Sequence, residues 1–498
     1  MIYLGIDSGT QSVKVIALEF KSGKIIASGS APHSMIPGLP SGHLEQDPDG
    51  WTEAAETAVQ ACLAELGDQK QDIKAIAVSG QQHGFVPLDE ANNVIRPAKL
   101  WCDTSTTAQC AQLTEELGGA DTVIDLIGNA MLPGYTAPKI LWLKENEPKN
   151  YRKLRWVLLP HDYLNYWLTG EKRMEYGDAS GTALLDVKSR KWSEAVMDEI
   201  DPELENKLPT LSSSKQPVGI LRESLREAWG LKQNPMITSG GGDNMMGAIG
   251  TGNVEPGIVT ASLGTSGTLY ACNDAPVIDP RGEVAAFCDS TDRWLPLACT
   301  MNVTVATEQV CSLFGWSHDE MEQAVAQTPP GAEGLLFLPY LNGERTPNLP
   351  KARGVFHGLT TANMTPGGLA RATMEGVTLG LAYGLQRLEQ LGITPTEIRI
   401  TGGGGKSKLW RQICADIFGV PVVALKNSEG AALGAAIQAA WIHHRCELDA
   451  EPITSFTKRF AAPDNKTRCE PGKHSEFYQE LLTKQTRLAK TLFVANAS

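Results

Sequence analysis

The sequence predicts a mixed α/β protein of two domains, and three observations favour this class. The chain has 498 residues, and at ~100–200 residues per domain this length favours at least two domains, each with its own core. Strand-like apolar runs alternate with helical patterns, which is typical of mixed α/β layers. A short strand–turn–strand motif also occurs twice, about half the chain length apart.

The predicted strands are spread over the whole chain. Antiparallel turns join some of them, and long helices separate others. They are Ile2–Ile6, Val13–Leu18, Ile25–Ser28, Ile73–Val78, Trp156–Leu159, Met236–Thr238, Ile258–Ser262, Ile398–Thr401 and Val420–Leu425.

Two helices have clear start signals. Asp47-Pro48 supplies an N-cap residue followed by proline at the first helical position, and apolar spacing continues to about Leu66. Thr365-Pro366 starts a second helix in the same way. We expect that helix to run to Leu391, with Gly392 as its C-terminal stop.

The composition is that of an ordinary globular protein with an acidic surface. Hydrophobic residues make up 42% and charged residues 20%, and the net charge is −13. Such a surface repels nucleic acid and anionic membranes, so the sequence predicts neither as a partner. It also repels phosphorylated ligands. A site for one must therefore create a local positive field from backbone N–H groups, a helix N-terminus or Mg²⁺.

The cysteines and the N-terminus predict a cytoplasmic protein. The ten cysteines include no C-x-x-C pair, which favours reduced thiols over disulfides or a metal site. The segment Met1–Asp7 lacks a basic region and a cleavage site, so we expect a first strand rather than a signal peptide. The longest small-apolar stretch, Gly430–Ile442, is too short to span a bilayer. The oligomeric state is left open, with a homodimer as the candidate.

The repeated motif contains a Gly-Thr pair between two strand-like runs. The pairs are Gly9-Thr10 and Gly264-Thr265. Glycine permits close backbone approach, so successive N–H groups can converge on phosphate oxygens, and the threonine hydroxyl adds a donor. Gly-Thr turns are also common in ordinary hairpins. Two of them in the same context indicate a pair of phosphate-binding turns facing each other across one cleft.

Two aspartates follow predicted strands where a catalytic carboxylate would be expected. Asp7 ends the first strand, where it could hold Mg²⁺ through water or merely cap the turn. Asp243 follows three glycines, Gly240–Gly242, after the strand at Met236. Phosphoryl transfer to a hydroxyl needs a carboxylate to accept the proton. The alternative is an N-capping aspartate for the next helix, and the glycines alone would favour it.

Polar residues in two further loops suit the binding of a sugar. Gln82 and His83 lie between glycines directly after the strand at Ile73–Val78, and Asp103 follows Trp101 closely. Amide, imidazole and carboxylate groups can bond to sugar hydroxyls, and a Trp face can pack on a sugar ring. A single histidine in a loop is more often structural, so each of these signals is weak by itself.

The glycine run Gly402–Gly405 resembles a P-loop but fails its pattern. G-x-x-x-x-G-K-[ST] requires glycine at position 400, which is Ile400. The run ends a strand and precedes a predicted helix, Lys408–Phe418, and such a turn suits packing against adenine, ribose or phosphate. The helix from Gly430 to Ala436 has little side-chain bulk, which indicates tight helix packing.

In this order, the motifs resemble those of the FGGY carbohydrate kinases, the sugar-kinase branch of the actin-like ATPase superfamily. The resemblance runs from Asp7 to about Arg445. Asp7–Lys14 is similar to that family's first phosphate motif, Ser262–Gly267 to its second and Gly402–Ser407 to its adenosine motif. Gly354–Leu359, with the helix start that follows, is similar to the second family signature.

The resemblance implies two actin-like, ribonuclease H-like α/β domains flanking a central cleft. Residues 1–246 would hold most of the sugar site, and residues 247–498 most of the nucleotide site. ATP and Mg²⁺ would be the cofactors, and a small sugar and ATP the ligands. The implied roles are catalysis by Asp243 and Asp7, with Asp7 linked to Mg²⁺; sugar binding by Gln82, His83, Asp103 and Asn244; and ATP binding by Gly9, Thr10, Lys14, Gly264, Thr265, Gly403, Gly404 and Lys406.

Within that family, three segments resemble the branch that phosphorylates D-xylulose: Gly240–Asn244, Leu132–Lys139 and Pro339–Pro347. Bacterial members of the branch commonly carry Met where this chain has Gln82. The alternatives are a kinase for ribulose, gluconate or glycerol, and a non-enzymatic sugar or nucleotide sensor on the same fold. The glycerol branch differs because it carries Gly-Asp-Gln-Gln where this chain has Gly-Asp-Asn.

Overall fold

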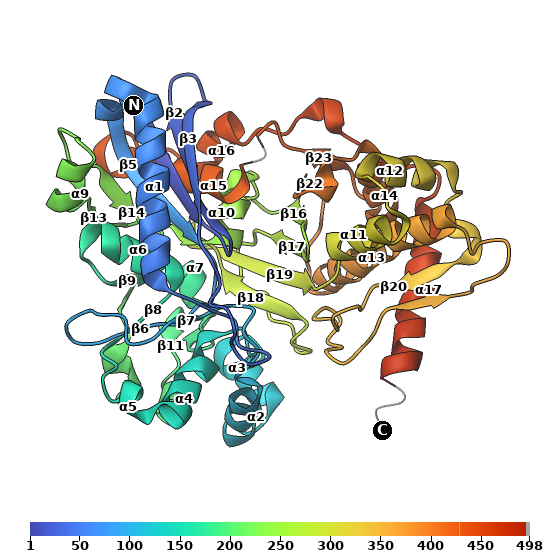
Figure 1. The fold of residues 1–498 in the computed structure, drawn as a ribbon, viewed down its shortest axis with the longest axis horizontal. Helices are drawn as coiled ribbons and strands as arrows, with labels where there is room; N and C mark the ends of the chain where they lie inside the picture. The colour runs from blue at the N-terminus through green and yellow to red at the C-terminus, as the bar shows by residue number, and fades with distance from the viewer. Residues whose placement is uncertain (428, 495–498) are drawn as a thin grey trace. The chain divides into compact units, whose positions relative to one another are not determined.

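The computed structural model describes residues 1–427 and 429–494, and its course is shown in Figure 1. The chain forms two compact units that are not consecutive halves. Unit 1 comprises Met1–Val254, Asn273–Leu295 and Glu429–Ala462. Unit 2 comprises Glu255–Cys272, Pro296–Ser428 and Pro463–Ser498. The division of sugar and nucleotide binding at residue 246 stays a prediction.

Unit 1 is built on a central sheet with the strand order β13-β14-β5-β1-β2-β3, and β15 pairs with β5. Strand β1 pairs antiparallel with β2 and parallel with β5. The bounds are β1 Ile2–Ser8, β2 Ser12–Glu19, β3 Lys24–Pro32, β5 Ile73–Gly80, β13 Pro217–Ile220, β14 Met236–Thr238 and β15 Gly241–Gly242.

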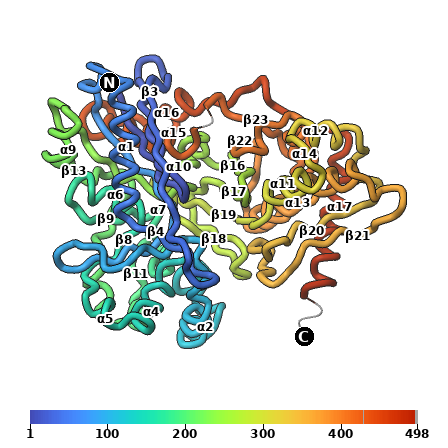
Figure 2. Tube along the Cα trace, viewed as in Figure 1, coloured from blue at the N-terminus to red at the C-terminus, as the bar shows by residue number. Residues whose placement is uncertain are grey.

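Helices cover both faces of this sheet, as the strands' alternation requires. Leu4 and Ile6 of β1 belong to the same core as Trp51 of helix α1 (Pro48–Leu66). Gly5 points to the other face, where an added Cβ would lie 2.0 Å from the carbonyl oxygen of Ala432. That carbonyl belongs to α15 (Gly430–Glu447), so this helix lies directly on the backbone of β1. The tube in Figure 2 shows α1 beside β3, and α15 also packs against β1.

The rest of unit 1 consists of short strands and helices. The strands are β4 Glu45–Gln46, β6 Val86–Leu88, β7 Ala98–Lys99, β8 Trp156–Leu158, β9 Arg173–Glu175, β10 Leu185–Asp186, β11 Lys191–Trp192, β12 Thr210–Ser212 and β18 Val284–Cys288. The helices are α2 Thr107–Glu116, α3 Ala120–Ile127, α4 Thr136–Asn146, α5 Pro148–Tyr151, α6 Pro160–Thr169, α7 Tyr176–Ala179, α8 Glu194–Ile200, α9 Glu223–Ala228, α10 Asp243–Gly250 and α16 Ile453–Phe460.

Unit 2 repeats the central pattern of unit 1. Its sheet includes the order β19-β17-β16-β22-β23, in which β16 pairs antiparallel with β17 and parallel with β22. The elements are β16 Ile258–Leu263, β17 Gly267–Ala271, β19 Trp294–Thr300, β20 Leu336–Leu338, β21 Val355–His357, β22 Glu397–Thr401, β23 Val422–Ala424, α11 Thr304–Phe314, α12 His318–Gln327, α13 Pro366–Gln390, α14 Lys408–Phe418 and α17 Ser475–Phe493.

The predicted elements and their signals are confirmed. Asp47 is the N-cap of α1, and its side chain accepts the N–H of Asp49. Thr365 caps α13 in the same way, and Gly392, with φ +98°, lies just past that helix. The two Gly-Thr turns join β1 to β2 and β16 to β17, so the internal repeat is structural. Among the described residues, no helix combines the length and apolarity needed to cross a bilayer.

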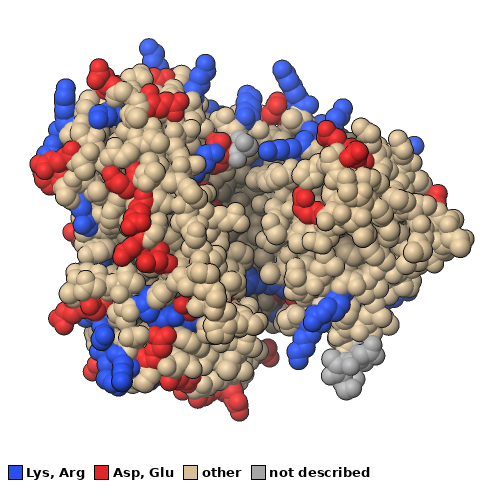
Figure 3. Space-filling view, viewed as in Figure 1, with Lys and Arg blue, Asp and Glu red and all other residues tan. Residues whose placement is uncertain are grey.

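The surface carries both signs of charge. On the face drawn in Figure 3, lysine and arginine side chains are interspersed with aspartate and glutamate side chains. Mixed charges of this kind keep a protein soluble without creating a single-sign field over the whole surface. The excess negative charge over the chain, a net −13, therefore leaves the attraction of an anionic ligand to local groups.

Candidate active site

The three glycines before Asp243 allow its segment to lie against strand β5. Gly240 has φ +64°, and an added Cβ there would lie 2.1 Å from the carbonyl oxygen of Val78. Gly241 and Gly242 form β15 and pair with Ser79 and Gly80 at the end of β5. Asp243 is therefore placed beside the end of a buried strand. It is the first residue of α10, whose N-cap is Gly242, so the N-capping alternative is wrong.

Asn244 links the predicted base to the predicted sugar loop. Its side-chain Nδ2 donates to Oδ1 of Asp243 at 2.9 Å and to Oε1 of Gln82 at 2.7 Å. Gln82 is buried, and its Nε2 contacts the sulfur of Met245 at 3.1 Å. The structure therefore brings Asp243, Asn244 and Gln82 together, although Gln82 lies far from the other two in the sequence.

Two carboxyl groups in this region have raised pKa values. Burial, then the negative charges of Asp7 and Asp178, raise the pKa of Asp243 to about 7. Burial also raises the pKa of Asp7 to about 6, although Ser79 donates to its Oδ1 at 2.7 Å. A carboxylate with a pKa near 7 is well matched to general-base catalysis near neutral pH.

The first Gly-Thr turn is held by polar contacts from three segments. The N–H of Gly9 closes the turn by donating to the carbonyl oxygen of Ser12 at 3.1 Å. The carbonyl of Thr10 accepts Nε2 of Gln46 at 2.7 Å, and its hydroxyl accepts Nε1 of Trp101 at 3.2 Å. Lys14, on the following strand, forms an ion pair with Glu429. The turn is thus fixed before any ligand binds, which reduces the entropy lost on binding.

His83 lies in the loop after β5 in an unusual backbone conformation. Its φ is +61°, in the left-handed region that residues other than glycine seldom adopt. The side chain is buried, and its ring lies 5.0 Å from the ring of Tyr135 and 5.3 Å from that of Phe287. The structure therefore places His83 next to Gln82 in a closely packed position, while its contact with a sugar stays a prediction.

The carboxylate of Asp103 joins its own loop to the segment at Leu44. It accepts the N–H of Leu44 and the N–H of Ser105, each at 2.9 Å, and it lies 3.3 Å from Nζ of Lys99. These bonds occupy both of its oxygens. Asp103 thus holds the loop that carries Trp101, and its predicted contact with the sugar is supported by none of these interactions.

His43, Glu45 and Asp103 have the spacing of metal ligands, but Lys99 already neutralises them. Its Nζ lies 2.9 Å from Glu45, 3.3 Å from Asp103 and 3.3 Å from Nδ1 of His43. Both carboxyl groups have lowered pKa values despite burial, because cations and hydrogen-bond donors surround them. The lysine ammonium occupies the place that a metal cation would take.

In unit 2, the second Gly-Thr turn lies against the glycine run of the predicted adenosine motif. Gly402 has φ +83°, and an added Cβ would lie 2.5 Å from the carbonyl oxygen of Leu263, at the end of β16. Gly264 directly follows Leu263, and its N–H donates to the carbonyl oxygen of Ser266 at 3.1 Å. Gly403 has no atom within 4 Å of an added Cβ, so its backbone is open to a ligand. The turn and the run therefore form one glycine-rich surface.

The rest of that run leads into helix α14. Ser407 is its N-cap and accepts the N–H of Trp410. Lys406 is exposed and Gly404 is buried. Thr265 contributes its carbonyl oxygen, which accepts the N–H of Val303 at 3.0 Å. The roles of these residues in binding ATP stay predictions.

A buried charged cluster behind Asp243 was missed by the sequence analysis. It consists of His161, Asp162, Glu175 and Asp178, all at most 2% exposed. Nδ1 of His161 lies 2.7 Å from Asp178, and Nε2 lies 3.2 Å from Asp162. An added Cβ on Gly80 would meet His161 at 2.7 Å. The only signal in the sequence was the presence of charged residues among apolar ones near Pro160.

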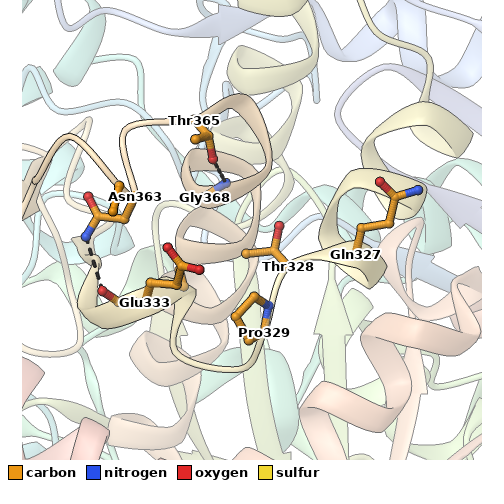
Figure 4. A pocket seen from close by; sticks show the side chains of 9 residues that line it. Gln327, Thr328, Pro329, Glu333, Asn363, Thr365 and Gly368 are labelled. Carbon is orange, nitrogen blue, oxygen red and sulfur yellow. Dashed lines mark hydrogen bonds between the residues drawn. The ribbon is translucent and has the colours of Figure 1, made fainter.

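A separate pocket in unit 2 contains none of the predicted site residues. Its volume is about 220 Å³, and it lies at the start of α13. Figure 4 shows Thr365 accepting the N–H of Gly368 and Asn363 donating to the backbone of Glu333. These polar groups serve to end one loop and begin the helix, so we assign the pocket no ligand.

The structure contains two Gly-Thr turns, an aspartate near the end of the first strand and a carboxylate of raised pKa at a helix start. Such groups are compatible with an enzyme that transfers phosphate from a nucleotide. Comparison with known proteins agrees. The N-terminal domain model of the FGGY family of carbohydrate kinases matches residues 2–250, and its C-terminal domain model matches residues 259–443. The chain belongs to this family and is an ATP-dependent sugar kinase.

Individual relatives match over most of their length. The chain is 43% identical to the xylulose kinase of Haemophilus influenzae, over 90% of this chain and 92% of the relative. It is 38% identical to the xylulose kinase of Escherichia coli, over 87% of this chain and 89% of that one. The crystal structure of xylulose kinase from Bifidobacterium adolescentis has a TM-score of 0.81 at 32% identity and covers 96% of this chain and 99% of its own. The predicted fold class and family are confirmed.

Proposed function

We propose that this chain transfers the γ-phosphoryl group of ATP to O5 of D-xylulose. The observation that carries the proposal is the arrangement at Asp243: a carboxylate with a pKa near 7, fixed at a helix start and bonded through Asn244 to Gln82. The similarity to xylulose kinases supports the choice of sugar.

Asp243 is the general base in this proposal. Its carboxylate accepts the proton of the O5 hydroxyl as that oxygen attacks the γ-phosphorus. The new O5–P bond forms as the bond from the γ-phosphorus to the β–γ bridging oxygen breaks, and ADP leaves with that oxygen. Asn244 holds Oδ1 of Asp243 at 2.9 Å, so the base is oriented before the sugar binds.

Asp7 is the residue that would hold Mg²⁺, and the local chemistry fits this ion. The pKa values of Asp7 and Asp243 are both raised, and the negative charge of Asp7 is one cause of the raised pKa of Asp243. Bound Mg²⁺ would supply positive charge to the phosphates of ATP. A divalent cation relieves repulsion between close carboxylates, and Mg²⁺ prefers few protein carboxylates with water.

The nucleotide is proposed to contact both Gly-Thr turns and the glycine run. An added Cβ would meet no atom within 4 Å at Gly403 and only the carbonyl oxygen of Ser12, at 3.8 Å, at Gly9. At Gly264 it would lie 3.3 Å from the carbonyl oxygen of Ser266, so this backbone has less room. Thr10, Thr265, Lys14, Gly404 and Lys406 complete the proposed set of ATP-binding residues.

We further propose a cytoplasmic location, because all ten cysteines are free thiols. A homodimer stays a prediction.

The test is a substrate panel with purified enzyme. ADP release is followed with D-xylulose, D-ribulose, D-fructose, gluconate and glycerol, and kcat/KM is compared. We expect D-xylulose to give the highest value and phosphate to be found on O5 by NMR of the product. A clearly higher kcat/KM for another sugar would overturn the sugar assignment and leave the kinase intact.

A further inference from the structure

Lys139 is fully buried in unit 1. It lies in the first turn of α4, which begins at Thr136, and its exposed fraction is 0%. It closes the Leu132–Lys139 segment, to which the reaction described above gives no role. Removing a lysine amine from water is costly unless its hydrogens are bonded, so the partners of this side chain define what it does.

The partners of Lys139 are two backbone carbonyls from different segments. Its Nζ donates to the carbonyl oxygen of His83 at 2.7 Å and to that of Gly134 at 2.6 Å. The hydroxyl of Thr136 donates to the same His83 carbonyl at 3.2 Å. The start of one helix therefore places two side-chain donors on the backbone of the predicted sugar-binding histidine.

The backbone at His83 needs such support. Its φ of +61° is unfavourable for a residue with a Cβ and persists only where the surroundings impose it. The imidazole also has little room, because an added Cβ on Gly181 would lie 2.0 Å from its Nδ1. The backbone and the ring of His83 are therefore both held in one closely packed arrangement.

The contact does not depend on the charge of the amine. Burial lowers the pKa of Lys139 to about 7, although the negative charge of Asp103 acts in the opposite direction. Cys102 and Cys110 act in the same sense as Asp103, and Lys99 acts against them. A neutral amine still has two N–H donors, which is the number of carbonyls that Lys139 binds.

We propose that Lys139 is a positioning residue of the sugar site: its amine, together with the Thr136 hydroxyl, holds the His83 peptide in the left-handed conformation that places the imidazole for sugar binding. The proposal rests on the proposed function and on the predicted contact between His83 and the sugar. It assigns Lys139 to sugar affinity and gives it no part in ATP binding.

The test is a double-mutant cycle with Lys139→Met and His83→Ala, measured with D-xylulose and ATP. We expect Lys139→Met to raise the KM for D-xylulose about tenfold or more, as for the loss of a buried hydrogen bond, with the KM for ATP unchanged. In the His83→Ala background, Lys139→Met should have no further effect on the sugar KM, because it acts through that residue. Lys144→Met is the control: Lys144 lies on the same helix and binds the carbonyl of Ile200, and its sugar KM should match the wild type.

The outcomes separate this inference from the sugar assignment. If His83→Ala raises the sugar KM and Lys139→Met does not, or if the two effects add, Lys139 is merely structural and the inference is overturned. If His83→Ala leaves the sugar KM unchanged, His83 does not contact the sugar and this inference is overturned, whereas the substrate panel still decides whether D-xylulose is the sugar. Should Lys139→Met fail to fold, Thr136→Val removes the other donor to the same carbonyl, and it must raise the sugar KM without adding to His83→Ala.

Discussion

At the scale of single residues, glycines in this chain serve two different purposes that the sequence alone does not separate. At Gly5 an added Cβ would lie 2.0 Å from a backbone oxygen of α15, whereas at Gly9 its nearest neighbour would be 3.8 Å away. The first glycine is required by helix packing. The second is not required by the fold, which is what a ligand-binding glycine should show.

Substitution of the turn glycines should therefore affect ATP more than folding. We expect Gly9→Val and Gly264→Val to raise the KM for ATP by about ten- to a hundredfold, the loss of a hydrogen bond to a charged group. The KM for the sugar should stay near that of the wild type. Steady-state kinetics with each substrate varied provide the measurement. A normal ATP KM in either variant would make that turn merely structural.

The assignment of Asp243 as the base is testable by an isosteric change. Asp243→Asn removes the proton acceptor but keeps the side-chain shape, so kcat should fall by roughly 10²–10⁴-fold while ATP still binds. Asp201→Asn is a matched control, because Asp201 bonds to Tyr151 away from the site. Near-normal turnover of Asp243→Asn would remove the residue from the role of base.

At the scale of elements, glycines also set how close two helices of unit 1 lie. An added Cβ at Gly434 of α15 would lie 1.7 Å from the carbonyl oxygen of Met246 in α10, and one at Gly250 of α10 would lie 1.9 Å from that of Gly430. The small residues of the Gly430–Ala436 stretch therefore let α10 pack against α15 through backbone contact. This contact fixes the position of α10 and of Asp243, its first residue. The tight packing predicted for that stretch is confirmed.

A methyl group at this helix contact should cost both stability and activity. We expect Gly434→Ala to lower the free energy of unfolding by ~1–3 kcal/mol, the usual cost of overpacking, and to lower kcat because α10 moves. Gly380→Ala in α13 is the control. Its Cβ would meet Pro339 at an ordinary 3.5 Å, so the better helix propensity of alanine should leave it as stable or more so. Calorimetry of both variants gives their melting temperatures. Equal melting temperatures would contradict the prediction that close helix packing requires glycine at position 434.

Elements and turns were predictable from the sequence because their signals are local. Asp47-Pro48, Thr365-Pro366 and both Gly-Thr hairpins depend on neighbours within a few residues. The contacts that build the site are not local: Asn244 meets Gln82 and Lys139 meets His83. The bonds that the Asp103 carboxylate makes to Leu44, Lys99 and Ser105 were likewise not evident from the Trp-Cys-Asp sequence, and its contact with the sugar stays a prediction.

At the scale of the whole molecule, the chain conceals several charged groups whose protonation depends on folding. Burial lowers the pKa of His161, but Asp162, Asp178 and Glu175 outweigh that effect and raise it to about 9. Burial raises the pKa of Asp162 and that of Glu175, each to about 7. The folded protein therefore binds protons at this cluster that the unfolded chain releases.

The direction of the pH dependence follows from these shifts. The stabilising contribution of His161 is complete below its ordinary pKa of 6.5 and is lost as the pH rises through about 9. The ordinary pKa values of Asp162 and Glu175 are 3.8 and 4.5, and the folded protein raises each to about 7. The stabilising contribution of their protonated forms is therefore lost as the pH rises to about 7. All three groups make stability fall with rising pH, because the native state holds more protons than the unfolded state.

We therefore expect the melting temperature to fall by a few degrees between pH 6 and pH 9. Asp162→Asn removes one acid of the cluster and can still accept the N–H of Leu159 through its amide oxygen, as Asp162 does at 3.0 Å. With that charge removed, His161 loses its largest opposing charge and its pKa moves toward the ordinary value. The slope of melting temperature against pH should accordingly be shallower in Asp162→Asn than in the wild type. Calorimetric scans of both proteins at half-unit pH steps measure this slope. A wild-type melting temperature that is flat or rises across this range would show that the cluster does not retain its protons in the folded state.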